Sequence, residues 1–267
     1  MMRKKITIPE LQQMKLEGRR IAVLTAYDYP TAKLLDEAGV DILLVGDSAA
    51  VVFCGYETTL PITMEEMLYH LKAVVRARPR ALVVADMPFM ACQSGETEAL
   101  KNCGRMLKEG GAEAVKIEGG VNMAPIVRAV TEMDIPVMGH VGLTPQSVHR
   151  MGGYKVQGRK EQAERIIEDA VAVQEAGAFA LVLEGIPSSL AARITETLDI
   201  PTIGIGAGPD CSGQVLVIHD ILGLCEKYSP KFVRRYADLG PLITAAARQY
   251  VSEVKDGIFP TEEHSFR

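Results

Sequence analysis

The 267-residue sequence has no tryptophan, and aromatic residues make up only 5% of it. It contains no run of about 18 uncharged apolar residues, which a membrane-spanning helix needs, and residues 1–20 lack the apolar core of a secretory signal. Basic residues are not in excess, since 29 Lys and Arg stand against 34 Asp and Glu, for a net charge of −5. These absences predict a cytoplasmic protein that binds neither membranes nor nucleic acid.

Cysteine is scarce and irregularly spaced. The five cysteines, Cys54, Cys92, Cys103, Cys211 and Cys225, include no C-x-x-C pair and leave one over after pairing. An odd number without close pairs is not typical of a disulfide framework or a zinc site. Reduced and mostly buried thiols are therefore the simplest interpretation.

What the sequence does contain is typical of a globular α/β protein. Hydrophobic residues make up 48% and charged residues 24%, which excludes a disordered chain. Short apolar runs rich in Val, Ile and Leu recur along the whole length, as in parallel strands that are buried on both faces. They span residues 21–26, 41–45, 81–85, 114–117, 136–138, 178–183, 201–205 and 214–218.

Helical patterns fill the segments between these runs. Thr63 and Glu66 have the spacing of a capping box, and the apolar residues after them have the spacing of a helix that lies on a sheet. Residues 98–109 and 161–175 have similar patterns. Strands and helices that alternate in a chain of this length predict a single (β/α)8 TIM barrel over residues 1–267, with a short N-terminal extension. A doubly wound open sheet is the alternative.

Ionisable side chains stand where five consecutive apolar runs stop. They are Asp47, Asp86, Lys116, Glu118, His140 and Glu184. In a parallel barrel the carboxyl ends of the strands converge on one mouth, where the active sites of this fold lie. Each residue alone also fits a structural role, as a turn cap, an ion-pair partner or a buried histidine. Together they predict an active site.

The acidic residues of this set suit a hard metal ion. Asp47, Asp86 and Glu118 are carboxylates from neighbouring strands, and carboxylate oxygens are ligands that Mg²⁺ prefers. A 2-oxo acid would bind such an ion through its carboxylate and keto oxygens, and the ion would stabilise the enolate that forms when the neighbouring carbon loses a proton. Lys116 would add positive charge near the enolate oxygen. Ser48 is a candidate to hold the substrate carboxylate.

Glu184 ends an apolar run, a position suited to general acid/base chemistry on that carbon. A glycine-rich segment, residues 203–208, follows the next run with the spacing G-x-G-x-G. A dinucleotide-binding loop needs G-x-G-x-x-G at the start of a helix. Room for a ligand or close backbone packing is therefore the better interpretation of this segment.

Several of these segments closely resemble the ketopantoate hydroxymethyltransferase family. They are residues 46–48, 59–63, 85–90, 115–120 and 139–147, which read GDS, TLPIT, ADMPFM, VKIEGG and GHVGLTPQS. The similarity continues through residues 152–158, 183–184, 203–208, 219–220, 230–232 and 262–266, so it covers essentially the whole chain. Ala49, Ala50 and Ser212 depart from the family pattern, which affects only loop detail near the mouth.

The resemblance implies a barrel of the phosphoenolpyruvate/pyruvate superfamily, commonly assembled as a homo-decamer. It implies a magnesium site on Asp47, Asp86 and Glu118, substrate contacts from Asp47, Ser48, Asp86 and Lys116 with His140 nearby, and Glu184 as the proton acceptor. The implied reaction belongs to pantothenate biosynthesis: a hydroxymethyl group passes from 5,10-methylenetetrahydrofolate to 3-methyl-2-oxobutanoate, giving 2-dehydropantoate and tetrahydrofolate. A magnesium-dependent 2-oxo acid lyase or mutase on the same barrel is the alternative, and a non-catalytic binding barrel is another.

Overall fold

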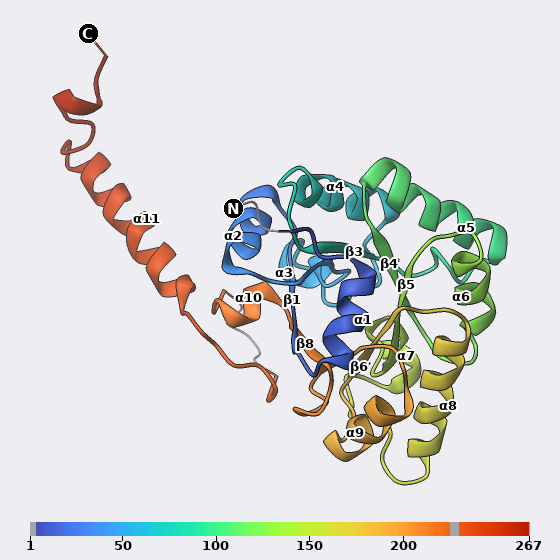
Figure 1. Cartoon of the computed structure of the whole chain (residues 1–267). Coiled ribbons are helices and arrows are strands. Elements are labelled where there is room, and N and C mark those ends of the chain that lie inside the picture. Colours follow the sequence, from blue (N-terminus) through green and yellow to red (C-terminus); the bar gives the residue numbers. More distant parts are fainter. Residues whose placement is uncertain (1–3, 225–229, 267) are drawn as a thin grey trace. The chain divides into compact units, whose positions relative to one another are not determined.

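Eight parallel strands close into a barrel in the computed structural model, which describes residues 4–224 and 230–266 (Figure 1). The strands follow one another in chain order, and the barrel closes where β1 pairs with β8. They are β1 (Ile21–Thr25), β2 (Ile42–Val45), β3 (Leu82–Asp86), β4 (Ala114–Glu118), β5 (Val137–Gly142), β6 (Ala180–Glu184), β7 (Thr202–Ile205) and β8 (Gly213–Leu216). Each strand overlaps a predicted apolar run. The TIM barrel is therefore confirmed, and the open sheet is wrong.

β5 is longer than its apolar run, because the strand continues through Gly139 and His140 to Gly142. A Cβ atom at Gly139 would lie 2.3 Å from Val173 Cγ1 of α8 (Gln162–Glu175), so glycine permits this helix to pack closely on the strand. The extension places His140 in regular strand geometry, in register with Glu118 of β4.

Helices cover the outside of the barrel (Figure 1). Besides α8 they are α2 (Tyr29–Ala38), α4 (Met64–Val75), α5 (Glu96–Arg105), the π-helix η1 (Met106–Gly110), α6 (Ala124–Thr131) and α9 (Ser188–Thr197). Shorter helical segments follow the carboxyl ends of β2 and β5, namely α3 (Ala49–Val52), the 3-10 turn η2 (Pro145–Ser147) and α7 (Val148–Met151). The helix predicted over residues 98–109 is thus divided between α5 and η1. Among the described residues, no helix is long and apolar enough to cross a membrane.

The predicted capping box begins α4. Thr63 Oγ1 accepts the Glu66 N–H at 3.2 Å, and the Thr63 N–H donates to Glu66 Oε2 at 2.8 Å. We expect Thr63→Ala to lower the free energy of unfolding by about 1 kcal/mol, because one amide at the start of the helix loses its partner. Thermal denaturation should show a Tm about 2–4 °C lower. Thr97→Ala, at an exposed position of α5, is the control that should leave Tm unchanged; equal Tm values for both variants would contradict the role of Thr63.

The amino-terminal segment closes the end of the barrel opposite the carboxyl ends of the strands. In α1 (Ile8–Leu16), Leu11 is 0% exposed and Met14 is 5% exposed. Both belong, with Ile6, to a buried apolar cluster that includes residues near the starts of the strands, such as Ile21. The predicted N-terminal extension is therefore part of the barrel core.

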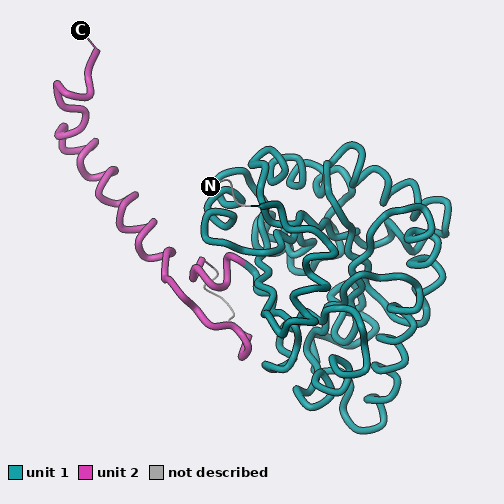
Figure 2. Tube along the Cα trace, viewed as in Figure 1, with its two compact units in different colours: residues 1–217 teal, residues 218–267 magenta. Residues whose placement is uncertain are grey.

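The chain divides into two compact units, residues 1–217 and residues 218–267 (Figure 2). The first unit contains all eight strands, and the second contains α10 (Ile218–Ile221), α11 (Leu239–Lys255) and the short η3 (Glu262–His264). Every residue of α11 is exposed or partly exposed. A single domain over residues 1–267 stays a prediction.

The described cysteines are free thiols. Cys92, Cys103 and Cys211 are buried and Cys54 is exposed, so most of these thiols are buried, as expected. Cys225 lies outside the described residues.

Candidate active site

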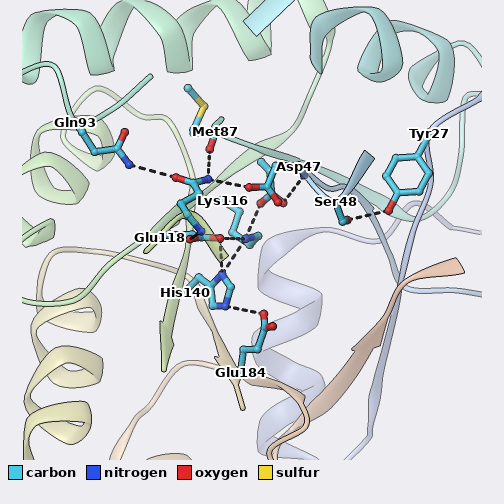
Figure 3. A network of polar contacts seen from close by, with 11 residues as sticks. Tyr27, Asp47, Ser48, Met87, Gln93, Lys116, Glu118, His140 and Glu184 are labelled. Atoms are coloured by element: carbon cyan, nitrogen blue, oxygen red, sulfur yellow. Dashed lines mark hydrogen bonds and ion pairs between the residues drawn. The ribbon is translucent and has the colours of Figure 1, made fainter. Parts of the chain in front are cut away.

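The ionisable residues predicted from the strand ends lie together at the mouth of the barrel (Figure 3). Asp47 follows β2, Asp86 ends β3, Lys116 and Glu118 lie on β4, His140 lies on β5 and Glu184 ends β6. Parallel pairing places Asp86 in register with Lys116, and Glu118 in register with His140. All except Glu184 are buried, with exposed fractions between 2% and 7%. The barrel geometry therefore brings every predicted ionisable residue into one polar network.

A buried lysine is at the centre of the network. Lys116 Nζ lies 2.8 Å from Asp86 Oδ1, 3.0 Å from His140 Nδ1 and 3.8 Å from Glu118 Oε1. Burial alone lowers the pKa of a lysine, but the charges of Asp86, Glu118 and Asp47 outweigh it and raise the pKa of Lys116 above its ordinary value. Lys116 is therefore a fixed positive charge that can stabilise a developing oxyanion.

His140 connects this lysine to Glu184. His140 Nε2 lies 3.1 Å from Glu184 Oε2, and Nδ1 lies 3.4 Å from Glu118 Oε1. Burial and the Lys116 charge lower the pKa of the imidazole, and the neighbouring carboxylates of Glu118 and Glu184 act in the opposite direction and raise it. However, His140 Nδ1 lies closer to Lys116 Nζ, at 3.0 Å, than to Glu118 Oε1. Since the lysine ammonium already donates a proton into this short contact, Nδ1 has to be the acceptor and cannot have a proton of its own. We therefore assign the neutral tautomer, in which Nδ1 accepts from Lys116 and Nε2–H donates to Glu184, against the direction that the carboxylates favour.

Asp47 and Asp86 are joined through the main chain, since the Asp47 N–H donates to Asp86 Oδ2 at 3.0 Å. Burial and then the charges of Asp86 and Glu118 raise the pKa of Asp47 to about 8. Burial also raises the pKa of Asp86, against the effect of Lys116. For Glu118, burial acts upward, but the charge of Lys116 and the hydrogen bond from the Gln146 main-chain N–H act in the opposite direction, and the pKa is lowered. The carboxylates outnumber the cations, so a further cation would relieve their repulsion.

Gln146 links two of these carboxylates and is missing from the predicted site. Its Nε2 donates to Asp47 Oδ2 at 3.0 Å and to Met87 O at 2.9 Å, and its main-chain N–H donates to Glu118 Oε2 at 3.1 Å. The side chain is buried, and it is 99 positions away from Asp47 in the chain. Only the family motif of residues 139–147 contains a signal for this residue, because an isolated glutamine in a sequence indicates no chemistry.

Ser48 lies beside the network and contacts a second residue that sequence reasoning missed. Ser48 Oγ is 2.9 Å from the hydroxyl of Tyr27 (Figure 3). Tyr27 is buried, and burial raises its pKa above the ordinary value. The neutral phenol therefore orients the Ser48 hydroxyl at the edge of the site.

The glycine-rich segment, residues 203–208, is closely packed. A Cβ atom at Gly208 would lie 2.2 Å from Ser188 Cβ, and one at Gly204 would lie 2.9 Å from Cys211 Sγ. Close backbone packing is thus the reason for these glycines.

The donor set fits a small, hard cation, although residues 4–224 and 230–266 include no group of three or more His, Cys, Asp or Glu side chains already arranged around a metal position. Asp86 Oδ1 and Glu118 Oε1 are buried and, apart from their ion pairs, accept no well-directed hydrogen bond. Such oxygens have spare capacity for a metal ion, and Mg²⁺ favours carboxylate oxygen with water or substrate in its other positions.

Comparison with known proteins identifies close relatives of the chain. The family model of ketopantoate hydroxymethyltransferase matches residues 5–262. A protein of Trichlorobacter lovleyi called 3-methyl-2-oxobutanoate hydroxymethyltransferase is 85% identical, over 99% of this chain and 100% of the relative. A protein of Pelobacter propionicus with the same name is 71% identical, over 99% of this chain and 98% of the relative.

Solved structures with low sequence identity share the fold. A phosphonopyruvate hydrolase in complex with oxalate and Mg++ has a TM-score of 0.61 at 14% identity, covering 96% of this chain and 92% of that one. A 2,3-dimethylmalate lyase, described as a member of the PEP mutase/isocitrate lyase superfamily, has a TM-score of 0.63 at 17% identity, covering 97% and 88%. The chain thus shares the barrel fold of these structures.

Proposed function

The chain belongs to the ketopantoate hydroxymethyltransferase family, a family of transferases, and from this premise we propose that its one-carbon donor is 5,10-methylenetetrahydrofolate. The acceptor is 3-methyl-2-oxobutanoate, and the products are 2-dehydropantoate and tetrahydrofolate. The observation that carries the proposal is the convergence of Lys116, His140 and Glu184 beside paired aspartates at one barrel mouth. These groups suit the formation of an enolate from a 2-oxo acid.

Asp47 and Asp86 would hold Mg²⁺, with Glu118 as a ligand directly or through water. When bound, the ion supplies Lewis-acid chemistry at the keto oxygen of the substrate. The phosphonopyruvate hydrolase with the same fold is described with oxalate and Mg++, and oxalate has two adjacent oxygens like those of a 2-oxo acid enolate.

The protein's own residues have separate tasks. Ser48, oriented by Tyr27, holds the substrate carboxylate, and Lys116 places its charge near the keto oxygen. Glu184, partly exposed at the end of β6, takes the proton from C3. The 3.1 Å contact with His140 Nε2 holds the Glu184 carboxylate in position for this step.

The atoms of the transfer balance with one water molecule. The bond between C3 and its proton breaks, and C3 forms a bond with the methylene carbon of the folate, whose two carbon–nitrogen bonds break. Water supplies the oxygen of the new hydroxyl and the protons on the two folate nitrogens, while the C3 proton ends on the hydroxyl.

A turnover assay tests the proposal. With Mg²⁺ and 3-methyl-2-oxobutanoate, the protein should form 2-dehydropantoate only when 5,10-methylenetetrahydrofolate is added. Exchange of the C3 proton with deuterium oxide should occur without any folate. Product formed without a folate donor, or absence of both reactions, would refute the proposal.

Gln146 should tune the metal affinity, because its side-chain amide donates to the carboxylate of Asp47. The main-chain N–H that donates to Glu118 is kept in any substitution by a residue other than proline. We expect Gln146→Leu to raise the Mg²⁺ concentration for half-maximal exchange about 10- to 100-fold, as is usual for residues that orient metal ligands. Magnesium titration of C3 exchange measures this shift. Gln12→Leu, at an exposed position of α1, is the control; equal magnesium requirements of the two variants would contradict the role of Gln146.

The proposed setting is a homo-oligomer, a decamer by analogy with the family, in the cytoplasm. α11 has large apolar side chains that no other described element of its own unit buries, and another apolar surface is expected to cover them. They are Leu242, Ile243, Tyr250, Val251 and Val254. A sedimentation measurement of the molar mass in solution tests this assignment.

A further inference from the structure

A large cavity opens beside the reaction centre. Its volume is about 1060 Å³, and Glu118 and Gln146 of the polar network form part of its wall. The rest of the wall comes from the segments after β3, β4 and β5 and from α8. Pockets for drug-sized ligands have volumes of about 300–1,000 Å³, so this cavity is much larger than a five-carbon oxo acid requires.

The wall of the cavity combines three kinds of side chain. The buried residues Glu118 and Gln146 present polar groups, and apolar side chains such as Phe89, Met123 and Ile166 also line it. Three cations, Arg150, Lys155 and Arg165, line the cavity at exposed positions.

These cations are available for a ligand. Within the described part of the chain, none of the three side chains makes a hydrogen bond or an ion pair. Of the two acids on α8 that also line the cavity, Asp169 is engaged, because its Oδ1 accepts the Val121 N–H at 2.8 Å, and Glu168 is exposed. Arginine and lysine bind carboxylates through charge-assisted hydrogen bonds.

We infer that this cavity binds the folate donor, with its one-carbon end toward Glu118 and its glutamate carboxylates on Arg150, Lys155 and Arg165. The inference rests on the proposed function. A reduced folate has a flat ring system with hydrogen-bonding edges, an apolar aminobenzoyl group and a terminal glutamate with two carboxylates. The cavity contains a counterpart for each part: buried polar groups for the ring system, apolar side chains for the aminobenzoyl group and exposed cations for the carboxylates. Because the cations are exposed, a chain of further γ-linked glutamates can extend along them into solvent.

Charge reversal of the three cations tests the site. Loss of one exposed ion pair weakens binding by about 1.4- to 5-fold, and the three losses multiply. We therefore expect the triple variant Arg150→Glu, Lys155→Glu, Arg165→Glu to bind tetrahydrofolate triglutamate about 10- to 30-fold more weakly in calorimetry. Wild-type protein should prefer the triglutamate over the monoglutamate, and the variant should lose this preference.

Controls separate this inference from the proposed function. Arg159→Glu changes an exposed charge on the same segment that does not line the cavity, and it should keep the wild-type Kd. Folate-independent exchange at C3 reports whether the reaction centre of the triple variant is intact. If this exchange is lost, the Kd of the single variant Arg165→Glu for tetrahydrofolate triglutamate tests the site instead. An unchanged Kd in the variants, with one-carbon transfer intact in the wild type, would refute the folate site alone. Failure of the wild type to use the folate donor would refute the proposed function itself.

Discussion

Glu184→Gln should slow exchange of the C3 proton of 3-methyl-2-oxobutanoate by about 10²- to 10⁴-fold, the contribution usual for a general base. The amide has the size of the carboxylate and still contacts His140, but it cannot take a proton. Binding of the oxo acid should change little, because the proposed contacts of the substrate are with Ser48, Lys116 and the paired aspartates. Nuclear magnetic resonance of the substrate in deuterium oxide measures the exchange rate.

Glu196→Gln is the matched control, since Glu196 is an exposed residue of α9. It should exchange at the wild-type rate. Exchange at the wild-type rate in Glu184→Gln as well would remove Glu184 as the base. If Glu184→Gln lost both the binding of the oxo acid and the exchange of its C3 proton, Glu184 would position the substrate and would not be the base.

Lys116→Met should have the largest effect on stability. Asp86, Glu118 and Asp47 would then be buried without their cation, and removal of one partner of a buried ion pair costs about 3–5 kcal/mol. The methionine fills a similar volume, so the loss is mainly electrostatic. Turnover should fall as well, because the charge beside the keto oxygen is missing.

The loss of stability in Lys116→Met should increase with pH when no magnesium is present. The pKa of Asp47 is raised from 3.8 to about 8 in the folded protein, and that of Asp86 is also raised. The folded state therefore binds more protons than the unfolded state between these values, and its stability falls as pH rises through this interval. Without Lys116 both pKa values rise further, so the deficit of the variant is smaller at pH 5.5 than at pH 8.

Urea unfolding at the two pH values measures the deficit, with Lys33→Met at an exposed site as the control. Added Mg²⁺ should recover part of the stability at pH 8, because it replaces the missing positive charge. A deficit that is the same at both pH values would show that Lys116 acts through packing and not through charge.

The strands and the ionisable residues of the site were predictable because two local signals coincide. Strands buried on both faces appear as continuous apolar runs. A charged residue directly after such a run lies at the carboxyl end of the strand, which is at the mouth of a barrel. Asp47, Asp86 and Glu184 are of this kind. The extension of β5 through Gly139 and His140 was less visible, because glycine and histidine do not continue an apolar run.

The contacts that organise the site were beyond the reach of sequence reasoning. Gln146 meets Asp47 only because the 3-10 turn after β5 folds over the mouth, and nothing local to either residue indicates this. Tyr27 follows β1 and is buried beside Ser48, which follows β2, because these two strands are neighbours in the barrel. Such pairings depend on the closed order of the strands, and a sequence pattern specifies them only through the fold.

The helix α1, packed across the starts of the strands, decides how molecules reach the site. Because Leu11 and Met14 fill that end, the barrel axis is not a channel through the described structure. In the proposed reaction, both substrates would therefore arrive, and both products would depart, by the end where the strands finish. Of two ligands that share one route, the one seated deeper has to be the first to enter and the last to leave.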